Sequence, residues 1–377
     1  MILKVLVIGA GIMGAGIAQV AAQAGHPVLL FDLRDGAAAD ARRKLAGTLD
    51  GLVQKGKLSA DAAAATLACI RPIASLQEAA DAGMAVEAIV ENLDAKRGLF
   101  RELEGLLDPG AILCTNTSSI SITAIANGLR DPGRLVGMHF FNPVPLMKLV
   151  EVVHGLQTDA AVAGRVFELA RAWGKVPVHA KSTPGFIVNR IARPYYAEAL
   201  ALLQEQAATP QGLDACLKAA GFRMGPCELM DLIGHDTNLA VTQSVFEANF
   251  GDKRYVPSLV QREMVDGGLL GRKSGCGFYR YPEGVPALPA AAFGPPPPAR
   301  QVAVHGNGPV ADLLHAAATR ALRDDSLTRE RSSAWTGLQI DAARLMQAEG
   351  LPACDVAART GAGDVALFDR IVQLPCP

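Results

Sequence analysis

The sequence predicts an α/β domain with a doubly wound parallel sheet, followed by an all-helical domain. The chain opens with an apolar run, a glycine-rich turn and a segment of small apolar residues, in the order expected of strand, turn and helix. Apolar runs and helical patterns then alternate as far as residue 153, which is typical of a parallel sheet covered by helices. From residue 183 onward, amphipathic patterns replace this alternation and predict helices that pack on one another.

The glycine-rich turn has the spacing of a dinucleotide-binding site. The strand of residues 4–8 runs into Gly9, Gly11 and Gly14, and the next apolar run ends in Asp32. This pattern between a strand and a helix, with an acid about 20 residues on, binds a pyrophosphate at the helix N-terminus. Asp32 can accept hydrogen bonds from a ribose diol and would repel a 2′-phosphate. The sequence therefore predicts a Rossmann-type domain that binds NAD rather than NADP.

The same stretch has a second interpretation, because residues 5–25 carry no charge and a run of that length is typical of a membrane span. Its five glycines, together with Gln19 and Gln23, make a poor helix for lipid. No basic region and no cleavage site mark an export signal. We therefore expect a soluble, cytoplasmic protein without a membrane partner.

Composition narrows the class of partner. The formal net charge is −1 and no basic block occurs, so nothing favours nucleic acid, and a small-molecule substrate is expected. The seven cysteines form no Cys-x-x-Cys pair and accompany no histidine cluster, which argues against disulfides and against a metal site. Free thiols in a reducing compartment are expected instead.

The length of 377 residues and the changes in pattern predict four segments. They are a dinucleotide-binding domain (1–184), a helical domain (185–283), a proline-rich linker (284–300) and a small tail of unknown role (301–377).

Polar residues lie just after the ends of three predicted strands of the first domain: Glu91, Ser118 and His139. Doubly wound sheets bind their ligands at the carboxyl ends of the strands, so these side chains are expected near the cofactor. The strands predicted after the first two are residues 67–73, 84–90, 111–115, 134–138 and 149–153, and the helices are 35–56, 95–107 and one that begins near 121. Later helices are predicted through residue 206 and at 210–220, 226–248 and 256–267, and a strand–helix unit is predicted from residue 302.

His139 and Glu151 form a candidate pair for acid–base chemistry. Oxidation of an alcohol by a nicotinamide cofactor needs a base near the carbinol oxygen, and His139 is the best candidate. Glu151 is a lone carboxylate in an apolar strand, and it needs a partner because an unpaired buried charge costs several kcal/mol. A strand returning beside the first would bring the two together. The spacing also fits a structural histidine and an acid on an exposed edge.

Two further polar residues are ambiguous from the sequence alone. Ser118 lies in a run typical of a helix N-cap, and Asn189 fits an ordinary helix position. The basic residues between 42 and 57 form either a solvated helix face or a site for a phosphorylated substrate.

Together, these motifs resemble the 3-hydroxyacyl-CoA dehydrogenase family over residues 1–281. The motifs that carry the resemblance are residues 9–26, 86–93, 116–119, 139–153, 183–190, 225–236 and 271–279. The resemblance implies oxidation of a (3S)-3-hydroxyacyl-CoA to the 3-oxoacyl-CoA with NAD. The pathway implied is fatty-acid β-oxidation or a related acyl-CoA pathway such as phenylacetate breakdown.

The resemblance also implies roles for single residues. His139 is the expected general base, Glu151 is its partner, and Ser118 and Asn189 hold the carbinol oxygen and the acyl thioester. Contacts to CoA fall on Thr48 and Lys55 of the second helix, with Ser118 as a further substrate contact. The residues expected at NAD are Gly9, Gly11, Gly14, Asp32, Glu91, Lys96, Ser118, Asn142 and Lys273. The helical domain is expected to close over the substrate and to form a homodimer.

Residues 232–236 and the proline-rich extension resemble a longer subgroup that acts on 3-hydroxyadipyl-CoA and carries a second helical domain. This chain has no second segment like residues 185–190, so the tail is interpreted as a truncated remnant. Whether the substrate carries a terminal carboxylate stays open. Two other functions fit the fold. One is a dehydrogenase of a free hydroxy acid, and the other is a catalytically disabled NAD-binding paralogue.

Overall fold

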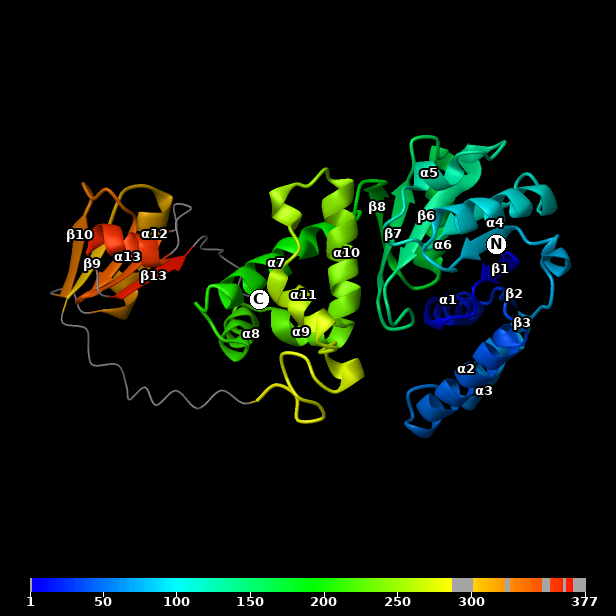
Figure 1. Cartoon of the computed structure of the whole chain (residues 1–377), viewed down its shortest axis with the longest axis horizontal. Helices are drawn as coiled ribbons and strands as arrows, with labels where there is room; N and C mark the ends of the chain where they lie inside the picture. Colours follow the sequence, from blue (N-terminus) through cyan, green and yellow to red (C-terminus); the bar gives the residue numbers. More distant parts are fainter. Residues whose placement is uncertain (1, 287–300, 323–325, 348–352, 362–363, 369–377) are drawn as a thin grey trace. The chain divides into compact units, whose positions relative to one another are not determined.

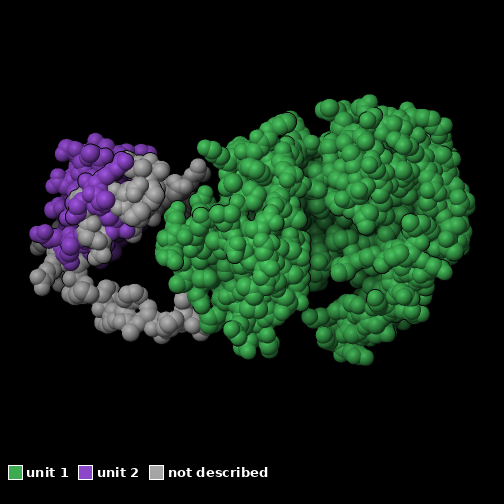
Figure 2. Space-filling model, viewed as in Figure 1, with its two compact units in different colours: residues 1–288 green, residues 289–377 purple. Residues whose placement is uncertain are grey.

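The computed structural model of the protein describes residues 2–286, 301–322, 326–347, 353–361 and 364–368. The chain divides into two compact units, residues 1–288 and 289–377 (Figure 2). Most of the predicted linker, residues 284–300, lies outside the described residues, and the predicted domain boundaries stay a prediction.

The first unit begins with an eight-stranded sheet (Figure 1). Across the sheet the strands are β3 (Ile70–Pro72), β2 (Val28–Phe31), β1 (Val5–Ile8), β4 (Met84–Glu87), β5 (Ile112–Thr115), β6 (Leu135–Phe140), β7 (Leu149–His154) and β8 (Val176–Lys181). Neighbouring strands run parallel except for β6 and β7, which are antiparallel.

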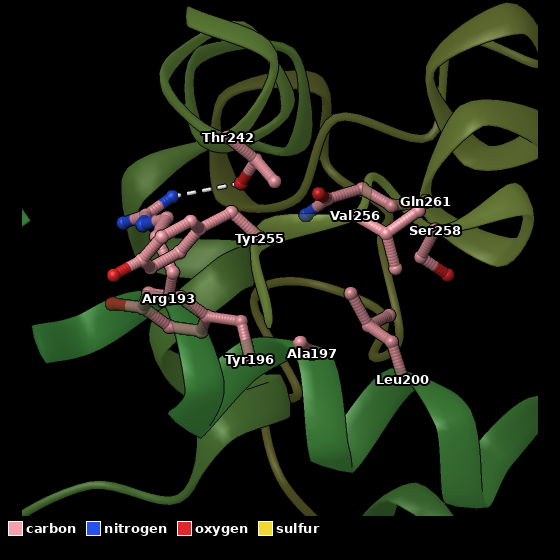
Figure 3. A pocket seen from close by; sticks show the side chains of 9 residues that line it. All are labelled: Arg193, Tyr196, Ala197, Leu200, Thr242, Tyr255, Val256, Ser258 and Gln261. Atoms are coloured by element: carbon pink, nitrogen blue, oxygen red, sulfur yellow. Dashed lines mark hydrogen bonds between the residues drawn. The ribbon is translucent and has the colours of Figure 1, made fainter. Parts of the chain in front are cut away.

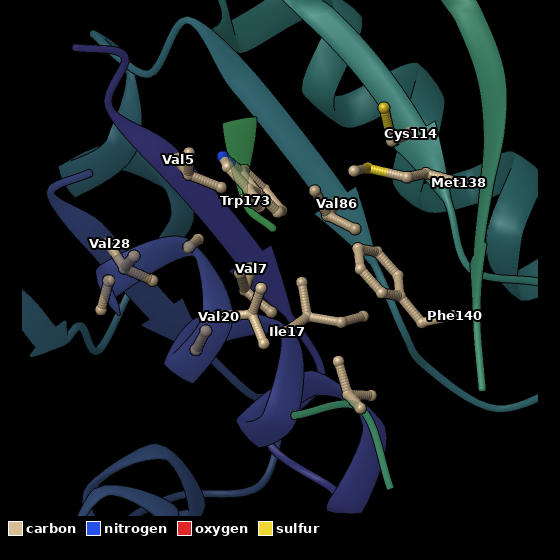
Figure 4. Packing of buried hydrophobic residues seen from close by; sticks show 14 of the residues in the cluster. Val5, Val7, Ile17, Val20, Val28, Val86, Cys114, Met138, Phe140 and Trp173 are labelled. Carbon is tan, nitrogen blue, oxygen red and sulfur yellow. The ribbon is translucent and has the colours of Figure 1, made fainter. Parts of the chain in front are cut away.

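Helices cover both faces of this sheet because its strands are apolar on both sides. Successive side chains of a strand point to opposite faces. Val5 and Val7 of β1 therefore join one core and Leu6 and Ile8 the other. Figure 4 shows the first core, where Ile17 and Val20 of a covering helix meet the strands. The helices of this part are α1 (Ile12–Gln23), α2 (Ala37–Gln54), α3 (Ala60–Ala68), α4 (Leu93–Leu106), α5 (Ile122–Ala126) and α6 (Ala160–Ala172).

The second part of this unit is helical, and it starts with its longest helix, α7. Its helices are α7 (Val188–Gln204), α8 (Pro210–Ala219), α9 (Pro226–Ile233), α10 (His235–Ala248) and α11 (Leu259–Asp266). A closing segment, residues 271–281, folds back on α9 around the buried carboxylate of Asp231. A Cβ on Gly277 would lie 2.1 Å from Asp231 Oδ1, so glycine is needed for this close approach.

Several predicted elements differ from the observed ones. The predicted helix 226–248 is two helices, because Gly234 takes a φ of 97° between α9 and α10. The predicted strand 67–73 is shorter, because residues 67 and 68 complete α3. No element was predicted between residues 154 and 183, where α6 and β8 lie.

The second unit is larger than the predicted strand–helix unit, although its first strand is β9 (Val302–His305) as expected. Its described residues form a five-stranded sheet in the order β10-β9-β11-β12-β13 and two helices. The remaining elements are α12 (Pro309–Ala321), β10 (Leu327–Glu330), β11 (Gly337–Ile340), β12 (Ala343–Gln347), α13 (Ala353–Thr360) and β13 (Asp364–Phe368).

We predict that Asp231→Asn destabilises the protein by about 3 kcal/mol, because it weakens a buried carboxylate that accepts several hydrogen bonds. Its donors are His235 Nε2, Tyr281 OH and the amides of Phe278 and Tyr279. Burial alone would raise the pKa of Asp231, but these donors outweigh burial and lower it. The stabilisation is therefore present above the ordinary carboxyl pKa and is lost as the pH falls through the lowered one.

Urea unfolding at pH 7 and at acidic pH measures this effect. The difference between wild type and Asp231→Asn should shrink as the pH falls. The exposed Asp266→Asn serves as the control and should unfold like wild type at each pH. Equal stability of Asp231→Asn and wild type at pH 7 would contradict the prediction.

Candidate active site

The turn between β1 and α1 leaves open space at one glycine and none at the two others. A Cβ on Gly9 would lie 2.4 Å from Ala88 O, and one on Gly14 would lie 1.7 Å from Gly9 O. A Cβ on Gly11 would meet nothing within 4 Å, so this glycine faces room for a ligand. The first turn of α1 carries no acidic residue. The turn therefore has the form and charge that suit a pyrophosphate.

Asp32 lies directly after β2, beside this turn. Its Oδ2 accepts a hydrogen bond from Ala10 N at 2.7 Å, and its Oδ1 accepts from Arg34 Nε at 3.0 Å. Burial alone would raise the pKa of Asp32, but the hydrogen bonds from Arg34 and Ala10 outweigh burial and lower it. Asp32 is thus an anion placed at the glycine turn, with the exposed guanidinium of Arg34 against it.

His139 and Glu151 face each other in the sheet. The antiparallel register of β6 and β7 makes them direct partners, and His139 Nδ1 donates to Glu151 Oε2 at 2.6 Å. Both side chains are buried. Because a carboxylate only accepts hydrogen bonds, the ring proton is on Nδ1 and Nε2 is left as an acceptor. Ser118 Oγ lies 3.0 Å from that Nε2.

The second oxygen of Glu151 binds the helical part of the chain. Its Oε1 accepts hydrogen bonds from Ile187 N and Val188 N, both at 2.9 Å, where α7 begins. Burial alone would raise the pKa of Glu151, but the hydrogen bonds from His139 and from these two amides hold it below its ordinary value. One carboxylate thus joins the histidine to the N-terminus of α7, where negative charge is stabilised.

Asn189 is the next residue of α7, so Glu151 also fixes the backbone that carries it. The carbonyl of Asn189 accepts from Arg193 Nε at 3.0 Å. Arg193 is buried and also donates to Asn238 O and Thr242 Oγ1 of α10, and it lies beside a small pocket (Figure 3). The start of α7 is therefore held from the sheet by Glu151 and from α10 by Arg193.

Glu91 organises the turn that carries Ser118. Its Oε1 accepts from Thr117 Oγ1 at 2.6 Å and from the amides of Ser118 and Ser119 at 3.0 Å. Burial alone would raise the pKa of Glu91, but nearby Lys96 and these donors lower it. Through Ser118, this turn is connected to His139.

Lys96 lies beneath Glu91, and sequence reasoning missed its main partner. The ammonium lies 2.6 Å from Glu87 Oε1 and 3.2 Å from Glu91 Oε2. Glu87 is an acid within an apolar strand, which is the signal that singled out Glu151. Residues 84–90 therefore carry the same signal, which predicts a buried partner for Glu87.

The loop between β6 and β7 carries Asn142. Its buried Val144 packs against α1, where a Cβ on Gly16 would lie 2.8 Å from Val144 Cβ. Buried Lys175 donates to Val144 O and Met147 O. Lys175 thus holds this loop against the glycine-turn helix, a contact that the sequence did not indicate.

The remaining predicted residues lie on other elements. Thr48 and Lys55 are exposed, on α2 and at its C-terminal end, and the hydroxyl of Thr48 donates to Lys44 O of its own helix. Lys273 forms an ion pair with Asp236 at the start of α10. The structure thus connects Lys96, Glu91, Ser118, His139 and Glu151 in one network, and Thr48, Lys55 and Lys273 are not members of it.

Comparison with protein families identifies both parts of the first unit. Residues 4–183 match the model of the 3-hydroxyacyl-CoA dehydrogenase NAD binding domain, and residues 185–281 match the model of the 3-hydroxyacyl-CoA dehydrogenase C-terminal domain.

Curated relatives agree with this assignment. The chain is 52% identical over 278 residues to 3-hydroxyadipyl-CoA dehydrogenase of Escherichia coli K12, covering 74% of this chain and 58% of that protein. It is 45% identical over 280 residues to a probable 3-hydroxybutyryl-CoA dehydrogenase of Deinococcus radiodurans, covering 74% of this chain and all of that protein (100%).

Solved structures are similar as well. The structure of 3-hydroxybutyryl-CoA dehydrogenase from Escherichia coli K12 has a TM-score of 0.81 at 42% identity and covers 99% of this chain and 73% of that one. The structure of (S)-3-hydroxybutyryl-CoA dehydrogenase from Ralstonia eutropha has a TM-score of 0.72 at 40% identity and covers 74% of this chain and 99% of that one.

The fold and the comparisons define an oxidoreductase with an NAD-binding domain. The chain belongs to the 3-hydroxyacyl-CoA dehydrogenase family. The predicted fold class, family and NAD cofactor are thereby confirmed. In the part of the chain that the structure describes, no helix has the length and apolar character of a membrane span, and no cluster of three or more metal-ligating side chains occurs.

We predict that kcat/KM is at least about 100-fold higher with NADH than with NADPH, because a 2′-phosphate would meet the charge of Asp32 and like charges in contact cost several kcal/mol. Steady-state kinetics with both cofactors measure the ratio. Asp32→Asn should lower it, and Arg34→Ala should raise it by removing the neighbouring cation. Asp35→Asn, which removes an exposed charge nearby, is the control. Equal kcat/KM for the two cofactors in the wild type would overturn the prediction.

Proposed function

We propose that the protein oxidises (3S)-3-hydroxyacyl-CoA to 3-oxoacyl-CoA with NAD. The observation that carries this proposal is the placement of His139, whose Nδ1 is held by Glu151 while its Nε2 faces the Ser118 hydroxyl. This site lies at the carboxyl ends of the parallel strands, where a doubly wound sheet binds its cofactor.

In this proposal, His139 is the general base. Its Nε2 takes the proton of the substrate 3-hydroxyl group as the C3 hydrogen leaves as hydride, and NAD supplies the hydride acceptor when bound. Glu151 keeps the ring in the tautomer with a free Nε2 and stabilises the imidazolium that forms. Because Glu151 has a lowered pKa, it stays ionised for this purpose at neutral pH.

Ser118 and Asn189 are proposed to hold the carbinol oxygen and the thioester. Ser118 is already within hydrogen-bond distance of His139 Nε2, so an oxygen bound there would lie beside the base. Asn189 follows the two amides that bind Glu151, which supports its place at the same site. The backbone restraints on α7 would let Asn189 bind with little loss of conformational freedom.

The remaining predicted contacts are part of the same proposal. Thr48 and Lys55 of the exposed α2 region are proposed to bind the CoA moiety, supported by neighbouring exposed Arg43 and Lys44. The residues that we propose to bind NAD are Gly9, Gly11, Gly14, Asp32, Glu91, Lys96, Ser118, Asn142 and Lys273. Lys273 is the least supported of these, because its ammonium pairs with Asp236.

The pathway proposed is fatty-acid β-oxidation or a related acyl-CoA pathway such as phenylacetate breakdown, in the cytoplasm. Relatives whose names specify 3-hydroxybutyryl-CoA and 3-hydroxyadipyl-CoA support an acyl-CoA substrate and leave its chain length open.

A homodimer through the helical domain, residues 185–283, is also proposed. An apolar groove of about 820 Å³ runs over α7, α8 and α9. Ile191 and Phe222 line this groove and are 68% and 50% exposed. An apolar surface of this kind is typical of an association site.

A free hydroxy acid as substrate stays the alternative. It is favoured by the likeness, at 28% identity and a TM-score of 0.65, to a structure described as a diketoreductase that acts on dicarbonyl compounds. Rates on acetoacetyl-CoA and on free acetoacetate, measured with NADH, separate the two functions. A higher kcat/KM on acetoacetate would favour the alternative, and no turnover of either compound would favour a disabled paralogue.

We predict that His139→Gln lowers kcat for acetoacetyl-CoA reduction at least about 100-fold, the usual contribution of general acid–base catalysis. His154→Gln is the matched control. His154 lies at the C-terminal end of β7, and its Nε2 pairs with His179 Nδ1 rather than with a residue of the proposed site. It should keep near-normal turnover. Near-normal turnover of folded His139→Gln would require a different base.

A further inference from the structure

A buried ion pair lies beneath Glu91, one of the residues proposed to bind NAD. Lys96 and Glu87 are 1% and 0% exposed, and Lys96 Nζ lies 2.6 Å from Glu87 Oε1. Glu87 also accepts from Ile89 N at 2.7 Å and from Thr115 Oγ1 at 2.6 Å. With three donors on its two oxygens, this carboxylate is firmly held between β4, β5 and α4.

Lys96 transmits this position to Glu91. The ammonium reaches Glu91 Oε2 at 3.2 Å, and the Glu91 side chain is 39% exposed. The other oxygen, Oε1, is occupied by donors from residues 117–119. Oε2 therefore has the capacity to accept a further hydrogen bond at the surface, beside the carboxyl ends of β4 and β5, where a doubly wound sheet binds its cofactor.

The burial of Lys96 makes Glu87 necessary. A buried ammonium needs a counter-charge, and Lys96 has two carboxylates within ion-pair distance. Of these two carboxylates, only Glu91 would remain to balance the charge of Lys96 if Glu87 lost its charge. The ammonium would then draw Glu91 inward, away from the surface. Because Glu87 neutralises most of the charge of Lys96, Glu91 can stay at the surface.

From this geometry we propose that Glu87 is a positioning residue for cofactor binding. Through Lys96, it sets the place of Glu91, whose Oε2 then accepts a hydrogen bond from the ribose next to the nicotinamide. The proposal rests on the proposed function, because it needs an NAD site at this edge of the sheet. Glu87 itself touches neither cofactor nor substrate.

Two ligands test this without any turnover. ADP-ribose carries the second ribose and ADP does not, so the ratio of their dissociation constants isolates contacts to that ribose. Calorimetric titration of the full chain measures both ligands. Glu87→Gln should weaken ADP-ribose about tenfold, the effect of one hydrogen bond to a charged group, and leave ADP unchanged. Lys96→Met should shift the ratio in the same direction. In the double variant, the loss of ADP-ribose binding free energy should be smaller than the sum of the losses in the two single variants.

The matched control is Glu104→Gln. Glu104 is a buried carboxylate near the other end of α4 and accepts hydrogen bonds from the amides of Arg130 and Asp131. The Glu104→Gln variant should keep the ratio of ADP-ribose to ADP affinity at the wild-type value. Glu87→Asp keeps the charge with a shorter side chain, and it serves as the second variant if Glu87→Gln does not fold. It should shift the ratio in the same direction by a smaller factor.

The outcomes separate the proposals. Failure of the wild type to bind ADP, ADP-ribose or NADH would overturn the proposed function. Normal binding by the wild type, with an unchanged ratio in folded Glu87→Gln and Glu87→Asp, would overturn the role of Glu87 alone. An equal loss of affinity for ADP and ADP-ribose would show a structural role and would also overturn it.

Discussion

The proposed active site depends on the hydrogen bonds that the buried carboxylate of Glu151 accepts. One oxygen binds the histidine ring and the other binds the first amides of α7, so a single buried anion joins the sheet to the helical part of the unit. Burial opposes this arrangement, since it alone would raise the pKa of Glu151, but the donors around the carboxylate outweigh burial. The charge that would support the base also holds the helix that carries Asn189.

Two such carboxylates shape the site from opposite sides. Glu91 gathers the amides and hydroxyls of residues 117–119, so that the Ser118 hydroxyl meets the free nitrogen of His139. Glu151 holds the other ring nitrogen. The ring is therefore fixed by partners on β7 and on the turn after β5, and little reorganisation would be needed during proton transfer.

Much of this arrangement could be predicted from local patterns. The glycine turn and Asp32 form a motif of short range, and a lone acid in the apolar strand 149–153 called for a buried partner. Glu87 carries the same signal, but the apolar residues around it dominate the pattern of its strand. The break at Gly234 was missed because helical periodicity continues across it, while the positive φ of that residue separates α9 from α10.

Other features depend on contacts between distant segments, which no local pattern reveals. The second oxygen of Glu151 finds the amides of residues 187 and 188, and Lys175 finds the carbonyls of the loop that contains Asn142. The elements α6 and β8 were missed because nothing in the motifs required them, yet β8 completes the sheet beside β7. The sheet of the second unit likewise pairs strands across intervening helices.

The central claim is that one carboxylate serves both the base and the helix. Amide hydrogen exchange over residues 186–189 tests it most directly, compared between Glu151→Ala and His139→Gln with kcat measured alongside. The account predicts that both variants lose turnover. It also predicts that exchange at Ile187 and Val188 accelerates at least about tenfold only in Glu151→Ala, because only there do these amides lose their acceptor. Unchanged exchange in folded Glu151→Ala would contradict the account.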